Sequence, residues 1–66
     1  MASGVFFIPD IEHEGDIQHC RSIIQDNGGE IVKVVWNGEP DDDAYIVFSA
    51  SSIQQVNNIK SILQDG

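Results

Sequence analysis

Cysteine is almost absent from this 66-residue chain, which contains only Cys20. An intramolecular disulfide is therefore excluded, and with it the class of small disulfide-rich secreted domains, so an intracellular location is expected. Long apolar runs are missing too. The first apolar block, Val5–Ile8, is closed by Pro9 and falls far short of the roughly 20 apolar residues that a membrane span needs. We expect a soluble protein with no signal peptide and no membrane contact.

Basic residues are also scarce. Three Lys and Arg stand against 11 Asp and Glu, which gives a formal net charge of -8. Proteins bind nucleic acids largely through Lys and Arg side chains that displace counterions from the phosphates. Direct binding of DNA or RNA is therefore not expected, and the charge favours a basic protein as partner.

The size of the chain sets a further limit. Its 66 residues form one domain, and a chain of this length buries only about 60% of its unfolded surface. The hydrophobic content of 41% nevertheless favours a folded core over disorder. Because domains this small are commonly supplemented by disulfides, a metal or a second subunit, we expect a homodimer.

Blocks of apolar residues predict five elements in the order βαββα. Strands are expected at 5–8, 30–36 and 45–48, a first helix at 16–26, and a second helix after 52 that ends at 65–66. Asp16 is expected to cap the first helix and Ser51 or Ser52 the second. The fold class is therefore α/β, a small three-stranded sheet with two helices.

The first and third strands are short and continuously apolar. Strands with one solvated face normally alternate apolar and polar residues, whereas these two do not. We therefore expect a sheet covered on both faces. If the first helix crosses over to a parallel second strand, it lies on one face, and the second helix covers part of the other.

Two acidic loops follow the first and second strands, at Asp10–Asp16 and Glu39–Asp43. Asn37-Gly38 alone favours a tight hairpin, but Pro40 and the aspartates lengthen the second loop. Strands running in the same direction would place both loops at one end of the sheet. There, Asp41, Asp42 and Asp43 are candidate contacts for a basic partner, while the alternative is that the charge only maintains solubility.

No residues form a recognisable catalytic or metal-binding set. The metal-capable side chains near the first helix lack the paired spacing of zinc ligands, and the aspartates of the second loop lack the EF-hand pattern. Cys20 lies on the apolar stripe of the first helix, as a small buried residue does. The metal-capable group is Glu12, His13, Glu14, Asp16 and His19. We expect no enzyme activity, no cofactor and no metal.

The run from Asn27-Gly28-Gly29 into the second strand, followed by 44–48 and a second helix with Lys60, resembles the first two-thirds of a BRCT domain. The match covers residues 4–64 and lacks that family's fourth strand and third helix. Trp36, the only tryptophan, ends the second strand instead. The resemblance implies an adaptor that binds proteins or phosphopeptides in nuclear DNA-repair, replication or telomere complexes. It also implies that Gly28 and Gly29 form the turn and that Lys60 is the candidate phosphate contact.

Two functions from different classes follow. The first is a BRCT-like interaction or dimerisation module, with candidate binding residues Gly28, Gly29, Trp36, Asp41, Asp42, Asp43 and Lys60. The second is an acidic inhibitor, of the type encoded by phages, that imitates DNA phosphates. An adaptor should present an apolar patch with charges around it, whereas a mimic should carry a stripe of carboxylates.

Overall fold

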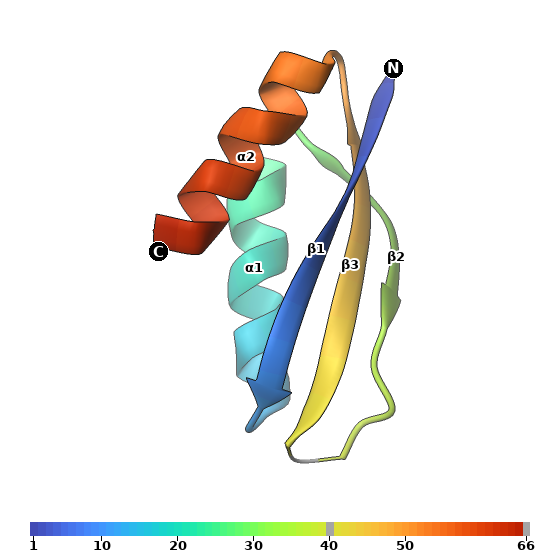
Figure 1. Cartoon of the computed structure of the whole chain (residues 1–66), viewed down its shortest axis with the longest axis vertical. Coiled ribbons are helices and arrows are strands. Elements are labelled where there is room, and N and C mark those ends of the chain that lie inside the picture. Colours follow the sequence, from blue (N-terminus) through green and yellow to red (C-terminus); the bar gives the residue numbers. More distant parts are fainter. Residues whose placement is uncertain (40, 66) are drawn as a thin grey trace.

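A computed structural model describes residues 1–39 and 41–65 of the chain. The elements follow the predicted order βαββα and form one three-stranded sheet with two helices (Figure 1). Their bounds are β1 Ala2–Ile11, α1 Glu14–Asp26, β2 Glu30–Val35, β3 Asp42–Ala50 and α2 Ile53–Asp65. The predicted fold class is confirmed, although β1 and β3 are longer than their apolar blocks. Pro40, which we expected to lengthen the loop before β3, lies outside the described residues.

The sheet has the order β1-β3-β2, and β3 is antiparallel to both neighbours. β1 and β2 therefore run in the same direction, but β3 separates them. β1 pairs with β3 in regular register from Ala2 to Ile8, and the register shifts between Ile8 and Ile11. Pro9 was expected to end this strand, whereas the structure accommodates it within the shift because proline is tolerated at edges and bulges.

Both helices lie on the same side of the sheet (Figure 1). The prediction of a sheet covered on both faces is therefore wrong. Inward and outward residues alternate along β1 and β3 as in any strand: Phe6, Ile46 and Phe48 face the helices, while Phe7 and Tyr45 face solvent. The sequence does not reveal this alternation because the solvent-facing residues are apolar as well.

The core lies between the sheet and the helices. β3, the central strand, contributes the largest share, and each helix presents one buried stripe to it. The buried core residues are Ile11, Ile17, Ile24, Ala44, Ile46, Phe48, Ala50, Val56, Ile59 and Leu63. The helical spacing of apolar residues in α2 predicts one stripe of Ile53, Val56, Ile59, Ile62 and Leu63. Of these, Ile53 and Ile62 are exposed.

The start of α2 is capped as predicted, whereas the start of α1 is not. The Ser52 hydroxyl accepts a hydrogen bond from the Gln55 backbone N–H at 3.2 Å, which satisfies one free donor of the first turn. At α1, His13 occupies the cap position without a side-chain cap. Asp16 lies inside the first turn instead, where its negative charge stabilises the helix by interacting with the positive end of the helix dipole.

Candidate functional site

The face of the sheet opposite the helices is not covered by any described element. Its side chains lie in three rows across the strands because directly opposed residues share a face. Read from β1 through β3 to β2, the rows are Ser3, Ser49 and Glu30; Val5, Val47 and Lys33; and Phe7, Tyr45 and Val35. We call these nine residues the open face.

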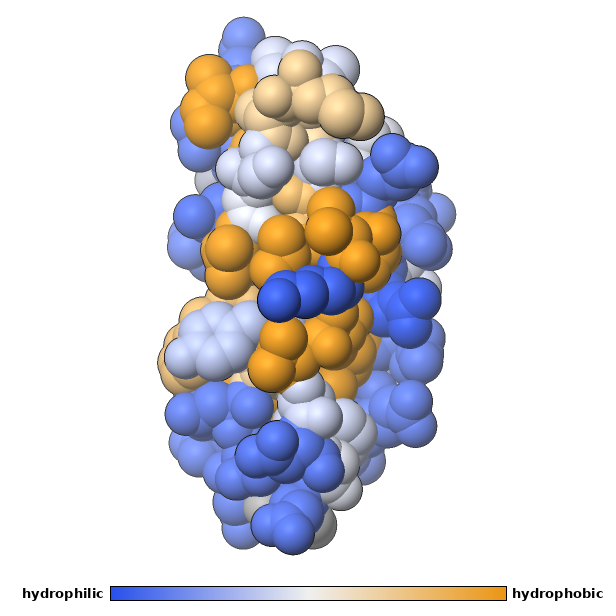
Figure 2. Space-filling view, turned by 90° about the vertical axis from the view of Figure 1, so that its right-hand side faces the viewer, coloured by the Kyte–Doolittle hydropathy of each residue, from blue (hydrophilic) through white to orange (hydrophobic). Residues whose placement is uncertain are grey.

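The two rows nearest the acidic loops are apolar apart from Lys33. Val5, Phe7, Val35 and Tyr45 each leave 43–49% of their surface exposed. The rings of Phe7 and Tyr45 pack at a centroid distance of 5.1 Å and an angle of 50°, a tilted arrangement that aromatic pairs favour. Figure 2 shows apolar side chains gathered across the middle of the molecule around one hydrophilic patch, with polar surface below them. A contiguous exposed belt of this kind is typical of a surface that binds another molecule.

A β-bulge shapes one side of the open face. Ile31 pairs with Phe48 and Lys33 with Val47, so Val32 is an extra residue without an opposite partner. Val32 is 60% exposed. The bulge also turns Lys33 to the open face, where its aliphatic stem can cover apolar neighbours while its ammonium group reaches solvent.

The two acidic loops meet at one end of the sheet, as predicted. The Asp41 N–H donates to the Ile11 carbonyl at 2.8 Å, and the Asp10 N–H donates to Asp43 Oδ1 at 3.2 Å. Eight of the 11 acidic residues lie in these two segments, either in the loops or at the adjoining ends of β1, α1 and β3. They are Asp10, Glu12, Glu14, Asp16, Glu39, Asp41, Asp42 and Asp43. We call them the acid pole. The two segments lie together at the lower end of the molecule in Figure 1, next to the row of Phe7, Tyr45 and Val35.

Replacing Asp41 by Gly is expected to stabilise the protein. Asp41 has a φ of 67°, a left-handed conformation that is strained for residues with a Cβ and free for glycine. The change also removes one of several like charges and keeps the N–H bond to Ile11. We expect a gain of about 0.5–1 kcal/mol, which corresponds to a rise in melting temperature of roughly 2–8 °C.

Asp43→Gly is the matched control because it removes the same charge. Asp43 lies within β3 and accepts the hydrogen bond from Asp10, so its loss should lower the melting temperature. Equal shifts in melting temperature for the two variants would show that the effect of these residues on stability comes from charge alone and not from backbone strain.

Gly28 and Gly29 lie at the end of α1, far from the acid pole, and form the predicted turn. Gly28 has a φ of +88°, which is the left-handed conformation that ends many helices. A Cβ on Gly29 would approach Ile24 Cγ2 to 2.6 Å and Ile59 Cδ1 to 3.1 Å. Gly29 therefore allows α1 and α2 to pack closely, which is a structural role.

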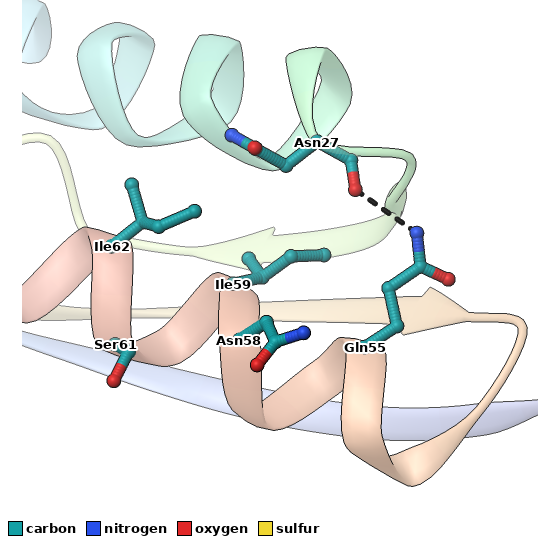
Figure 3. Close-up of a pocket in the computed structure, with 6 residues that line it drawn as sticks. All are labelled: Asn27, Gln55, Asn58, Ile59, Ser61 and Ile62. Atoms are coloured by element: carbon teal, nitrogen blue, oxygen red, sulfur yellow. Dashed lines mark hydrogen bonds between the residues drawn. The ribbon is translucent and has the colours of Figure 1, made fainter.

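A pocket of about 500 Å³ lies between the end of α1 and α2 (Figure 3). Three amide side chains and one hydroxyl surround it, and the Gln55 amide donates to the Asn27 carbonyl at 3.0 Å. Its lining residues are Asn27, Gln55, Asn58, Ile59, Ser61 and Ile62. Lys60 lies on α2 but does not line this pocket. The structure thus does not bring Gly28, Gly29 and Lys60 together around one cavity.

Trp36 lies just after β2 and packs against the core. Its indole Nε1 is buried and has no hydrogen-bond partner among residues 1–39 and 41–65. An indole in this position contributes mainly apolar packing. Of the predicted binding residues, only Asp41, Asp42 and Asp43 lie next to the open face.

Cys20 lies on α1, half-buried, and packs against the core. Burial raises the pKa of its thiol above the ordinary value, and the Asp16 carboxylate raises this pKa further. Both effects reduce the fraction of reactive thiolate at neutral pH.

Within the described ranges, no group of three or more His, Cys, Asp and Glu side chains is arranged to hold a metal ion. In the same ranges, neither helix is long and apolar enough to span a bilayer.

The sequence does not identify the open face because its residues do not form a motif. The continuous apolar blocks of β1 and β3 predict a second covering layer, and this prediction places their outward residues in the core. One signal was available: Lys33 interrupts a run of β-branched residues, and a charged residue inside a strand marks the face that meets water.

Comparisons with known proteins identify no relative. No protein-family model, no curated protein and no solved structure matches this chain. The resemblance to BRCT domains therefore stays a prediction from the sequence.

Proposed function

We propose that this chain is a non-catalytic module that binds another protein through the open face. The observation that carries the proposal is the apolar belt of β1, β3 and β2, which is exposed on a sheet whose other face packs against both helices. Leaving Phe, Tyr and Val side chains in water is unfavourable by roughly 25 cal/mol per Å². Binding a partner removes this cost.

The charge of the molecule specifies the partner further. The acid pole borders the belt at one end, and the whole chain carries a net charge of -8. Complementarity calls for a protein whose contact surface is apolar at its centre and basic on the side that meets the acid pole. The basic rim would speed the encounter, while the belt would supply most of the affinity.

The second candidate, an acidic inhibitor that imitates DNA, is favoured only by the acid pole. Such a mimic should spread its carboxylates as a stripe, whereas eight of the 11 acidic residues gather at one end of an apolar belt. This distribution supports the adaptor class. A BRCT-type role in a nuclear DNA-repair, replication or telomere complex is a finer form of the proposal and rests on the sequence resemblance alone.

The test compares two variants that add the same charge at different places. Val35→Asp puts a carboxylate within the apolar belt, and Ile53→Asp puts one on α2, at a residue that is 63% exposed. A partner captured by the tagged wild-type chain should bind the Val35→Asp variant at least about tenfold more weakly, since an anchor side chain is lost. Its affinity for the Ile53→Asp variant should be unchanged.

Salt separates the two candidate functions. Binding through the apolar belt should persist from about 0.15 M to about 0.5 M salt, whereas binding through the acid pole alone should be lost because salt screens exposed charges. Partner loss at moderate salt, together with full binding by Val35→Asp, would overturn the proposal in favour of the inhibitor.

A further inference from the structure

One edge of the sheet is open to pairing. β1 lies at the edge with β3 as its only neighbour, and its register is regular from Ala2 to Ile8. These seven residues, ASGVFFI, include no charged residue and no proline. Natural proteins usually protect edge strands with charges, prolines or bulges because unpaired N–H and C=O groups attract other strands.

The opposite edge is protected. β2 has six residues, carries Glu30 and Lys33, and is interrupted by the bulge at Val32. Charges, short length and bulges all oppose pairing at an edge. The two edges of the same sheet therefore differ, and only β1 offers a long, regular and uncharged template.

We infer that β1 pairs antiparallel with β1 of a second copy of this chain, which gives one continuous six-stranded sheet. The helices of both copies then lie on one side and both open faces on the other. Directly opposed residues in an antiparallel pair share a face, so residues of the open face must oppose residues of the open face. Centring the pair on Val5 satisfies this condition and uses all seven residues, with Ser3 opposite Phe7 of the second copy.

The charge distribution favours this direction. β1 spans 10 residues, or about 33 Å, and ends at the acid pole. Antiparallel pairing places the two acid poles at opposite ends of the dimer, separated by several Debye lengths of about 8 Å. Parallel pairing would place them side by side. A second copy is therefore compatible with this edge despite the high negative charge.

Pairing would also enlarge the open face. The open face of one chain has three strands about 4.8 Å apart and roughly 27 Å long, so its projected area is about 400 Å². A stable interface buries about 800 Å² per partner. Two open faces joined through β1 reach this size. Edge pairing uses the main-chain groups of β1, whereas the apolar belt binds through side chains, so the dimer does not depend on the proposed partner.

Sedimentation equilibrium of the pure chain from micromolar to millimolar concentration tests the dimer. We expect a species of twice the 7.3 kDa chain mass to appear as concentration rises. Val5→Asp should weaken association by about tenfold or more, because like charges directly opposite each other destabilise paired strands. Val35→Asp, on the same face but on the protected edge, should leave it unchanged.

A disulfide can trap the register. Opposed residues in antiparallel strands have Cα atoms about 4.5–5.5 Å apart, which a disulfide can bridge. With oxidised glutathione as the oxidant and in a Cys20→Ala background, Val5→Cys should form a covalent dimer rapidly, releasing reduced glutathione. Val35→Cys should do so at least about tenfold more slowly, since its thiols meet only by random collision.

Three results would overturn the inference: a single 7.3 kDa species at millimolar concentration, equal weakening of association by the two aspartate variants, or equal oxidation rates of the two cysteine variants. If the β1 edge paired only with a strand of another protein, the pure chain would stay a single monomeric species. Failure of the proposed function is distinguishable, because it would leave Val35→Asp with normal partner binding whatever the oligomeric state.

Discussion

Replacing Ile46 by Asp is expected to unfold the protein. Ile46 lies in the central strand with 0% of its surface exposed and packs in the core beneath the helices. Among the described residues, Ser49 is the only buried polar or charged one, so the new carboxylate would be buried without a basic partner. Burying an unpaired charge costs several kcal/mol, comparable to the whole stability of a domain of this size. Circular dichroism should show loss of the cooperative thermal transition.

Tyr45→Asp is the control for this prediction. Tyr45 is the preceding residue on β3, but it faces solvent on the open face. The same carboxylate there stays hydrated, and the variant should lose only the contact with Phe7, about 1 kcal/mol. A near-normal melting temperature for Ile46→Asp would contradict the placement of β3 at the centre of the sheet.

Phe48→Ala is expected to destabilise the fold by about 3–5 kcal/mol, as truncating a buried Phe does. Phe48 is fully buried, and its ring packs over Gly4, where a Cβ would lie 3.1 Å from the Phe48 Cζ atom. Gly4 has no side chain to fill the space that the ring leaves, so the cavity would persist. Urea denaturation monitored by Trp36 fluorescence measures the change in the free energy of unfolding.

Phe7→Ala removes the same side chain from the other face of the sheet. Phe7 is 43% exposed and contacts Tyr45, so its truncation should cost about 1 kcal/mol. The difference between the two phenylalanines follows directly from one covered and one open face. Similar losses for both would mean that each ring is buried.

The order of elements was predictable because their boundaries have local chemical causes. The glycines after Asn27 end α1, and Gly28 adopts the positive φ that this end requires. Ser52 caps α2. The meeting of the two acidic loops was predictable as well, since β1 and β2 run in the same direction.

The covering of the sheet was not predictable from these local signals. Both helices lie on one face, where their buried residues belong to the same core cluster as Ile46 and Phe48. This is a tertiary preference that the apolar runs of β1 and β3 do not encode. A continuous apolar run has two meanings. It marks either a strand buried on both faces or a strand whose open face binds something else.

The binding residues inferred from the sequence therefore separate into two groups. Asp41, Asp42 and Asp43 border the open face, whereas Gly28, Gly29 and Trp36 have packing or turn-forming roles. Lys60 belongs to neither group, because it lies on α2 and does not line the pocket beside it. The apolar residues of the belt carry no charged side chains and no motif spacing. They are recognisable as one surface only from the register of β1, β3 and β2.

The most direct measurement of the central claim is solvent accessibility of individual methyl groups, by nuclear magnetic resonance with a soluble paramagnetic agent. One open and one covered face predict strong broadening for Val5 and Val35 and little for Ile24, Ile46 and Ile59, which are fully buried. This holds in the monomer and in the β1-paired dimer, because edge pairing leaves the open face in water. Equal protection of Val5, Val35 and Ile46 would contradict the account, since the sheet would then be covered on both sides.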